Sequence, residues 1–334
     1  GQFTRFWESL RLLPDEVAAN EKVAYWRFSA AIATNNHRRL QSEVRNYLTE
    51  NEAAELRALV AISLPDSSMV HEAEQAYRAK ENSITTRSLG FAYAVSGQPE
   101  LGFDYLKRAN EYARREGNSH LQVATANELA VAHQLAGNYS EAYRWASWAL
   151  SQYNELGMKE ELRRLAIISE MAFPAILIGR VQSVAPLVDS IDIPEELYGI
   201  PSLEGLFSTL SEYAIVRGDI EAALEFAQVN MKHLPDTLRG YGAIGMVQAL
   251  LAANRSVEAI ELAESVYCSP YVSNEAEQLR CSLALGMALA HSEPEKVRPH
   301  LARSLNGHLQ LVNSPYLAIS TILLAGVPSA KNSL

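Results

Sequence analysis

The sequence predicts an all-α protein, a right-handed solenoid built from helical hairpins. Apolar residues recur at intervals of three to five positions along most of the 334 residues, which is the spacing of amphipathic helices. Strand signals are nearly absent, because β-branched residues seldom alternate with polar ones and no Asn-Gly or Asp-Gly turn joins two such runs. Turn residues recur every 36 to 42 positions, a period typical of helical repeats. These turns fall at Gly97, Gly137, Gly179, Gly218, Asn254 and about Ser292.

Residues 1–82 predict two irregular hairpins. The stretches 53–59 and 72–77 have the layout of degenerate repeat helices, with alanine and leucine at helical spacing. We expect helices near 15–34, 37–48, 51–63 and 68–80.

Residues 83–312 predict six hairpins of one kind. The clearest has amphipathic helices over 121–135 and 139–153, joined at Gly137-Asn138, where glycine can take a positive φ. Small residues recur in register around the turns, so that the two helices of a hairpin cross closely, and larger ones fill the remaining space. The small residues are Gly90, Gly102, Ala130, Ala142, Ala223, Ala227, Ala259 and Ala263, and the larger ones are Leu89, Tyr93, Leu106, Leu129 and Leu224.

Residues 313–334 predict one last helix. The apolar run from Tyr316 to Val327 has 12 residues and is interrupted by Ser320 and Thr321, well short of the roughly 20 that cross a bilayer. We expect it either to cap the last hairpin or to form a homodimer contact. Because neither end carries a tail, we expect the chain to be a piece of a longer protein.

Composition excludes several classes of protein. A hydrophobic content of 48% supplies a continuous core, which excludes general disorder. The net charge of −10, with lysine and arginine scattered singly, argues against nucleic-acid contact by this segment. Two cysteines cannot form a disulfide framework and no signal peptide begins the chain, so we expect a cytoplasmic protein that contacts no membrane.

The usual catalytic and cofactor motifs do not stand out. The string Gly240-Tyr241-Gly242-Ala243-Ile244-Gly245 follows a helix end at His233 to Asp236, whereas a dinucleotide fingerprint follows a strand, so we interpret its glycines as packing positions between repeats. The eight histidines have no metal-ligand spacing, and no nucleophile elbow, phosphate loop or pair of carboxylates is evident. The sequence therefore predicts no enzyme, no cofactor and no metal.

Three further side chains are predicted to have structural roles. His133 occupies a packing position in its repeat, and we expect it to be half-buried with one hydrogen bond. Cys268 and Cys281 are expected to be small buried hydrophobes, although they could also approach each other on neighbouring helices.

Two hairpins carry a recognisable motif. Leu89-Gly90-x-x-Tyr93-x-x-x-Gly97-x-x-x-x-Gly102-x-x-x-Leu106-x-x-Ala109 resembles the tetratricopeptide repeat (TPR), with glycine in place of the usual central alanine. Leu129-Ala130-x-x-His133-x-x-x-Gly137-x-x-x-x-Ala142-x-x-x-Ala146-x-x-Ala149 matches it again, with histidine in place of tyrosine. Later units match in part, so the resemblance covers about residues 83–312 and implies a TPR-like superhelix.

The repeat step exceeds the roughly 34 residues of a standard TPR. Longer helices of this sort are similar to two bacterial groups: the helical-repeat regions of LuxR-type or antibiotic-regulator-type transcriptional activators, and the peptide-pheromone receptors of the Rap, PlcR and arbitrium kind used in quorum sensing. No helix-turn-helix is evident, so a DNA-binding domain would lie outside this chain.

The resemblance implies a binding groove along the first helix of each hairpin. Asn127 and Gln134 lie two turns apart on one helix face, spaced to pair with the amides of an extended peptide. Arg87 is suited to hold a carboxylate, and Phe91 and Phe173 to seat apolar side chains. The predicted groove residues are Arg87, Phe91, Asn127, Val131, Gln134, Glu170, Phe173, Glu212, Tyr241 and Gln248.

Two functions fit these expectations. The first is a regulatory module that binds a peptide or partner protein in the groove and transmits the change to an effector, in bacterial transcription regulation or peptide signalling. The second is a passive scaffold for protein assembly. We would distinguish them by whether ligand binding changes the curvature of the superhelix.

Overall fold

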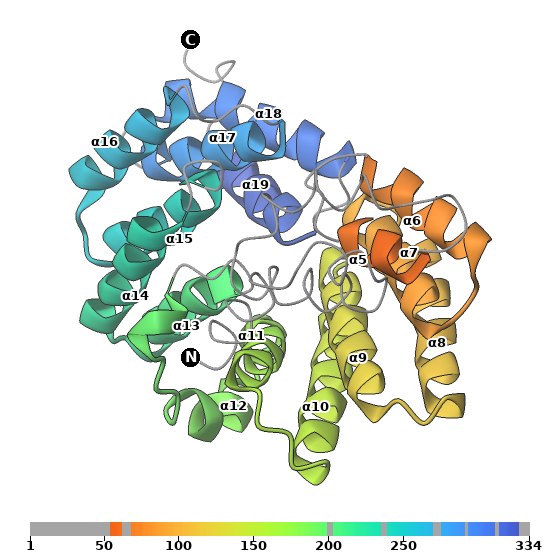
Figure 1. The fold of residues 1–334 in the computed structure, drawn as a ribbon. Coiled ribbons are helices and arrows are strands. Elements are labelled where there is room, and N and C mark those ends of the chain that lie inside the picture. Colours follow the sequence, from red (N-terminus) through yellow and green to blue (C-terminus); the bar gives the residue numbers. More distant parts are fainter. Residues whose placement is uncertain are drawn as a thin grey trace, which may run out of the picture. The chain divides into compact units, whose positions relative to one another are not determined.

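The computed structural model describes residues 54–61, 68–198, 203–234, 239–269, 275–290, 293–310 and 314–326. Every regular element in these ranges is helical, and the predicted all-α solenoid of hairpins is confirmed (Figure 1). The chain divides into two compact units, described separately below. The N-terminal unit comprises 1–133 and 145–159, and the C-terminal unit comprises 134–144 and 160–334. The division predicted from the sequence, at residues 82 and 312, stays a prediction, and the helices expected near 15–34 and 37–48 lie outside the described residues.

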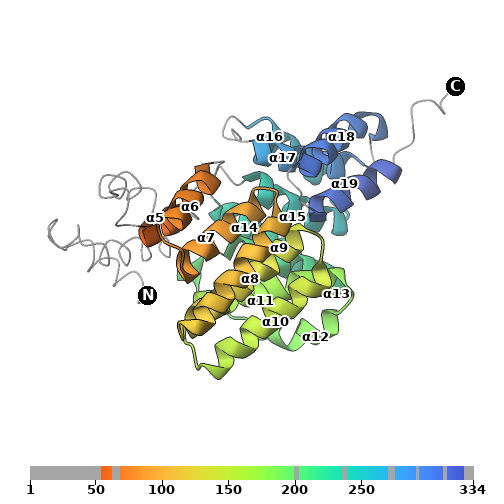
Figure 2. The ribbon, with the colours of Figure 1, turned by 90° about the vertical axis from the view of Figure 1, so that its right-hand side faces the viewer.

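The N-terminal unit consists of antiparallel hairpins in chain order. Helix α5 packs on α6, α6 on α7, and α7 on α8, and Figure 2 shows α7 and α8 side by side. Most of α9 and the second part of α10 belong to the same unit. The bounds are α5 Ala54–Ala61, α6 Ser68–Ala79, α7 Ser83–Val95, α8 Pro99–Arg115, α9 Ser119–Leu135 and α10 Tyr139–Glu155.

The C-terminal unit has two rows of helices. Helices α11, α13, α15, α17 and α19 each pack on the next, and we call them the inner row; α12, α14, α16 and α18 each pack on the inner-row helix that precedes them. In Figure 1 the inner row lines the inside of the arc that this unit makes. The bounds are α11 Glu161–Leu177, α12 Val181–Val188, η1 Glu195–Leu197, α13 Glu204–Arg217, α14 Ile220–His233, α15 Arg239–Ala252, α16 Ser256–Tyr267, α17 Glu275–Leu289, α18 Pro294–Gln310 and α19 Ser314–Gly326.

The turns lie where the sequence places them. At Gly218, φ is 79°, and the amides of Gly218 and Asp219 donate to the carbonyls of Ile215 and Ala214, at 3.0 and 2.9 Å. This is a Schellman arrangement, which satisfies the carbonyls at a helix end. The other described turn positions also have positive φ, at Gly97, Gly137, Gly179 and Asn254. The expected turn at Ser292 lies outside the described residues.

The hairpins cross as closely as their small residues predict. A Cβ atom on Gly102 would lie 2.8 Å from the carbonyl oxygen of Gly90 and 2.9 Å from the amide nitrogen of Ala94. Because real Cβ atoms do not approach backbone this closely, α7 and α8 can pack at this separation only with glycine at 102. The small residues of the later hairpins that the sequence singled out are buried, at 2% exposure or less: Ala130, Ala142, Ala223, Ala227, Ala259 and Ala263.

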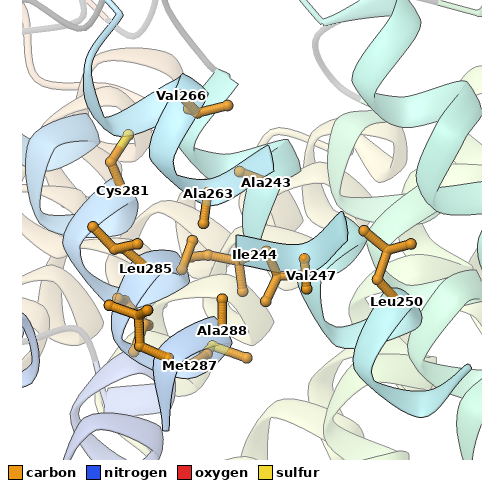
Figure 3. Packing of buried hydrophobic residues seen from close by; sticks show 14 of the residues in the cluster. Ala243, Ile244, Val247, Leu250, Ala263, Val266, Cys281, Leu285, Met287 and Ala288 are labelled. Carbon is orange, nitrogen blue, oxygen red and sulfur yellow. The ribbon is translucent and has the colours of Figure 1, made fainter. Parts of the chain in front are cut away.

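The core of the C-terminal unit is continuous from α15 to α18 (Figure 3). It interleaves alanines with larger residues such as Val247, Leu283 and Leu301, all fully buried. Cys281 belongs to this core, as expected of a small buried hydrophobe. The same expectation is wrong for Cys268, which is exposed because it caps the C-terminal end of α16. Both thiols are free, so the two cysteines do not pair.

His133 differs from its expected half-buried state. Its side chain is buried at 7% exposure and stacks on the ring of Phe103, with the ring centroids 4.2 Å apart. The exchange of tyrosine for histidine in this repeat is therefore accommodated by an aromatic neighbour on α8, in the preceding hairpin.

Candidate functional site

The predicted groove residues all lie on the first helix of a hairpin. Arg87 and Phe91 lie on α7, Asn127, Val131 and Gln134 on α9, Glu170 and Phe173 on α11, Glu212 on α13, and Tyr241 and Gln248 on α15. Because α9 is shared between the units, they divide between the N-terminal unit, which holds the first four, and the C-terminal unit, which holds the rest.

Two of the four groove positions of the N-terminal unit are engaged within the chain. Arg87 donates from Nε to Glu128 Oε2 at 2.8 Å, and its Nη2 donates to the other carboxylate oxygen, so the pair is bidentate. Phe91 packs against a buried cluster that includes Leu106 and Leu129. The carboxylate that Arg87 holds therefore belongs to the chain itself, and its binding of a ligand carboxylate stays a prediction.

Asn127 is different from these two. Its Oδ1 atom is buried and has no hydrogen-bond partner among the described residues. A buried amide oxygen without a partner costs about 1–3 kcal/mol, so Asn127 is the groove position of this unit whose hydrogen bonding is unfilled. Val131, one turn further along α9, is partly exposed.

In the C-terminal unit, a hydrogen-bonded pair links α9 to α11. Gln134 Nε2 donates to the backbone carbonyl of Glu170 at 3.1 Å and also to the Glu170 carboxylate. Burial raises the pKa of Glu170 to about 7, against the smaller opposing effect of the Gln134 bond. The Nε2 donor of Gln134 therefore already serves Glu170, and a role of Gln134 in ligand binding stays a prediction.

Glu212, on α13, is a second carboxyl with a raised pKa. Burial alone raises it to about 7, and within the described part of the chain no hydrogen bond or ion pair reaches its carboxylate. Gln248, on α15, likewise has a buried Oε1 with no partner among the described residues. Helices α13 and α15, which are adjacent in the inner row, thus each carry a polar side chain, and within the described residues the Glu212 carboxylate and Gln248 Oε1 accept no hydrogen bond.

Further along the inner row, an arginine lies between two tyrosine rings. The guanidinium carbon of Arg280, on α17, lies 5.4 Å from the Tyr241 ring centroid and 5.9 Å from that of Tyr316, on α19. Its Nη1 donates to Glu277, which is 1% exposed and whose Oε2 also accepts the Tyr241 amide at 3.1 Å.

One N–H group of the Arg280 guanidinium donates no hydrogen bond within the described part of the chain. This group is at Nε, which is buried. Burial opposes the charged form, but Tyr316, Glu277 and Tyr241 outweigh it and raise the pKa of Arg280, so the guanidinium stays charged.

The hydroxyl of Tyr241 reaches towards the preceding inner-row helices. A Cβ atom on Gly205, on α13, would lie 3.8 Å from Tyr241 Oη and 3.6 Å from Ser169 Oγ, on α11. Ser169 Oγ is also 3.4 Å from Thr209 Oγ1. Polar groups of α11, α13, α15 and α17 therefore adjoin one another along the inner row without interruption.

Sequence reasoning missed Glu277, Arg280 and Tyr316 as members of this site. The sixth hairpin was too degenerate for groove positions to be assigned. One signal was present, because Glu277 and Arg280 stand three apart in the sequence, the spacing of an ion pair on one helix face.

The glycine string at 240–245 opens α15 and packs against neighbouring helices. A Cβ atom on Gly240 would lie 2.8 Å from Cys281 Sγ, and one on Gly242 would lie 2.8 Å from Leu234 Cδ1. The packing interpretation is therefore confirmed for these two glycines. In the described ranges no group of three or more His, Cys, Asp or Glu side chains could hold a metal ion. No described helix is long and apolar enough to cross a membrane.

Comparison with known proteins supports the fold. No family model matches the sequence, and no curated protein matches it. The structure is similar to that of a Rap protein in complex with competence and sporulation factor, with a TM-score of 0.59 and 12% identity, over 94% of this chain and 98% of that chain. It is also similar to the apo form of the quorum sensor NprR from B. thuringiensis, with a TM-score of 0.55 and 11% identity, over 92% and 99%. The chain is thus a TPR-like superhelix that resembles Rap and NprR, as its repeat motif and repeat length predicted.

Proposed function

We propose that the chain is a non-catalytic regulatory module of the cytoplasm, and that its inner row binds a peptide or a segment of a partner protein. Binding would be transmitted to an effector in bacterial transcription regulation or peptide signalling. The similarity to a Rap protein bound to a signalling factor and to a quorum sensor supports this role by analogy of fold.

The observation that carries the proposal is the set of buried polar atoms with unfilled hydrogen bonding. Gln248 Oε1 and Arg280 Nε are buried without partners among the described residues, and Glu212 is a partly buried carboxyl whose pKa is raised by desolvation to about 7. Each costs stability when unpaired, so a fold that keeps them is best explained by a ligand that completes them. An extended peptide offers both amide donors and carbonyl acceptors along its length.

Native mass spectrometry of the chain, purified gently from the cytosol of its own host, tests this proposal. We expect a co-purifying peptide or protein of defined mass, lost from the Gln248→Ala variant and retained by the Glu258→Gln variant, which changes an exposed side chain on α16. A wild-type chain that carries nothing, and that gains nothing from host extract, would contradict the proposal.

A passive scaffold is the second candidate, because TPR-like superhelices also gather proteins without switching. Small-angle scattering with and without saturating ligand separates the two. A regulatory switch should change its radius of gyration, since a ligand that prefers one curvature shifts the population towards it. Unchanged dimensions would favour the scaffold.

A further inference from the structure

The contact between α18 and α19 contains a buried polar network. Ser304 Oγ of α18 lies 3.0 Å from Ser320 Oγ of α19 and 3.1 Å from His308 Nδ1 of α18. All three side chains are at most 1% exposed. Ile319 and Leu323 of α19 pack against the core of the C-terminal unit, so α19 docks through apolar and polar side chains together.

The geometry shows which imidazole nitrogen of His308 carries the hydrogen. Nδ1 lies 2.8 Å from the backbone carbonyl oxygen of Ser304, and a carbonyl oxygen only accepts hydrogen bonds. We therefore assign the hydrogen to Nδ1, which donates to this carbonyl, and the Ser304 hydroxyl is left to donate to Ser320 Oγ. A further proton on the ring has to bind at Nε2.

A positive charge on this ring is unfavourable while α19 is docked. Burial removes the water that would solvate an imidazolium, and the charge of Arg280 repels one. The bond to the Ser304 carbonyl favours the charged ring but does not offset burial, so the pKa of His308 falls from its ordinary value of 6.5 to about 4.

Both helices that pack on α18 contribute groups beside His308. Helix α17 contributes Arg280, whose Nη1 donates to Glu277. Helix α19 contributes Tyr316, whose ring centroid lies 5.1 Å from that of the imidazole and 5.9 Å from the guanidinium carbon of Arg280. The position of α19 is thus linked both to the burial of His308 and to the surroundings of Arg280.

We propose that the docking of α19 is coupled to the protonation of His308, so that a neutral ring keeps α19 on α18 and a protonated ring favours its release. Release withdraws Tyr316 from Arg280 and exposes the inward face of α19. The contact is then a pH-sensitive regulatory device within the C-terminal unit, and it does not depend on what the inner row binds.

The size of the coupling follows from the two states of the ring. Release returns His308 to water and its pKa to the ordinary value of 6.5, so the docked state loses stability as the pH falls from about 6.5 to about 4. Between pH 7.5 and 5.5 the equilibrium constant for release should rise about tenfold.

Amide hydrogen exchange of the full chain at pH 7.5 and 5.5, followed by mass spectrometry, tests the coupling. Protection factors correct the observed rates for the direct effect of pH on exchange, and they report the equilibrium constant for local opening. We expect the protection of residues 314–326 to fall about tenfold at pH 5.5, and that of α8, in the N-terminal unit, to stay unchanged.

Three variants assign this change to the network. His308→Gln keeps a hydrogen-bond donor but does not titrate, so the protection of α19 should be equal at the two pH values. Ser320→Ala removes the hydroxyl that α19 contributes, and it should lower protection at both pH values while keeping their ratio. Ile322→Ala is the matched control on the same helix: its side chain is 70% exposed, so the ratio should match that of wild type.

A loosened α19 in the His308→Gln variant would remove its readout at both pH values. In that case, nuclear magnetic resonance of the His308 ring in the wild type decides. We expect a titration midpoint near 4, and a midpoint near 6.5 would overturn the coupling.

The remaining outcomes also decide the matter. Equal protection of α19 at both pH values in the wild type would overturn the proposal. A pH dependence that persists in His308→Gln would do the same, because another group would then be titrating. An equal fall in the protection of α15 and α17 would mean that the whole unit opens, and not α19 alone. None of these results bears on the proposed function, which is tested by the co-purifying ligand.

Discussion

The two units use the same repeat positions in different ways. In the N-terminal unit, Arg87 is paired with Glu128 and Phe91 contributes to a core cluster. In the C-terminal unit, Glu212 and Gln248 hold equivalent positions without partners among the described residues. A position in the repeat therefore does not decide whether a side chain is satisfied within the chain; what decides it is which side chains the neighbouring helix presents.

The two units also differ in how an arginine beside tyrosine rings is bonded. Arg108 of the N-terminal unit lies 5.2 Å from the Tyr105 ring centroid and donates to Glu81 at 2.6 Å, in a cluster on α8 and the end of α6. Arg280 of the C-terminal unit also lies between tyrosine rings, yet its Nε is left without a partner. The side-chain bonds of the N-terminal arginine join two helices, whereas the C-terminal one keeps an Nε–H without a partner among the described residues.

The largest loss of stability should come from adding a methyl group where α7 and α8 of the N-terminal unit cross. Gly102→Ala places a methyl group 2.8 Å from the Gly90 carbonyl oxygen, and backbone cannot yield, so we expect a loss of about 3 kcal/mol in the free energy of unfolding. Urea denaturation followed by circular dichroism measures it.

The matched control is Gly245→Ala on the inner row of the C-terminal unit. A Cβ atom there meets only Ser208 Oγ, at 3.9 Å, and alanine favours a helix over glycine by about 1 kcal/mol. We expect unchanged or slightly increased stability. A Gly102→Ala variant as stable as the Gly245→Ala variant would show that the N-terminal hairpin is not as constrained as this comparison requires.

A smaller loss should follow from breaking the ion pair of the N-terminal groove. Arg87→Met leaves Glu128, whose side chain is 12% exposed, without its counter-charge, and we expect a cost of about 2 kcal/mol. The double variant Arg87→Met with Glu128→Met should recover most of it, because no buried charge remains. A thermodynamic cycle in urea gives the coupling. Peptide binding by the C-terminal unit should not change in either variant; a loss of binding would assign Arg87 to the ligand after all.

The free energy of unfolding should depend on pH through the carboxyl of Glu212. Burial raises the pKa of Glu212 from its ordinary value of 4.5 to about 7, so the folded protein binds a proton that the unfolded chain has released between those values. Its stabilising contribution is therefore complete below about pH 4.5 and is lost as the pH rises through about 7. We expect a loss of about 1–2 kcal/mol over this range, discounted because the side chain retains some contact with water.

The difference between wild type and Glu212→Gln isolates this contribution. It is needed because burial lowers the pKa of His308 to about 4, which makes stability rise with pH over part of the same range. Glu212→Gln should remove a decline in stability between pH 4.5 and 7.5 and leave the His308 effect. If the free energy of unfolding of wild type and of Glu212→Gln changes with pH in parallel, Glu212 is solvated or paired in the folded protein.

The fold followed from the sequence because its signals are local. The turn glycines at 97, 137, 179 and 218 require positive φ, and the small residues near them determine how closely the two helices cross. These are properties of single positions, which a periodic sequence displays directly.

The site followed only in part, because its chemistry depends on pairs across helices. The helix faces bearing Glu170, Glu212 and Tyr241 could be chosen from the repeat register. That Gln134 binds Glu170, or that Arg87 binds Glu128, depends on which side chains meet across 36 or 41 residues. Arg280 was missed for the same reason, since its tyrosine neighbours come from two different helices.

The smallest loss of stability should come from breaking an ion pair whose two side chains are both exposed. Arg255 and Glu258 lie three apart at the start of α16, with side chains 46% and 51% exposed, whereas the side chains of Arg87 and Glu128 are 21% and 12% exposed. Water and salt screen the exposed pair, so Glu258→Gln should cost less than about 0.5 kcal/mol and lose even that in 1 M NaCl. Urea denaturation at low and high salt measures both changes. A cost equal to that of Arg87→Met would mean that burial is not what distinguishes the two pairs, and the contrast between satisfied and open side chains would lose its energetic basis.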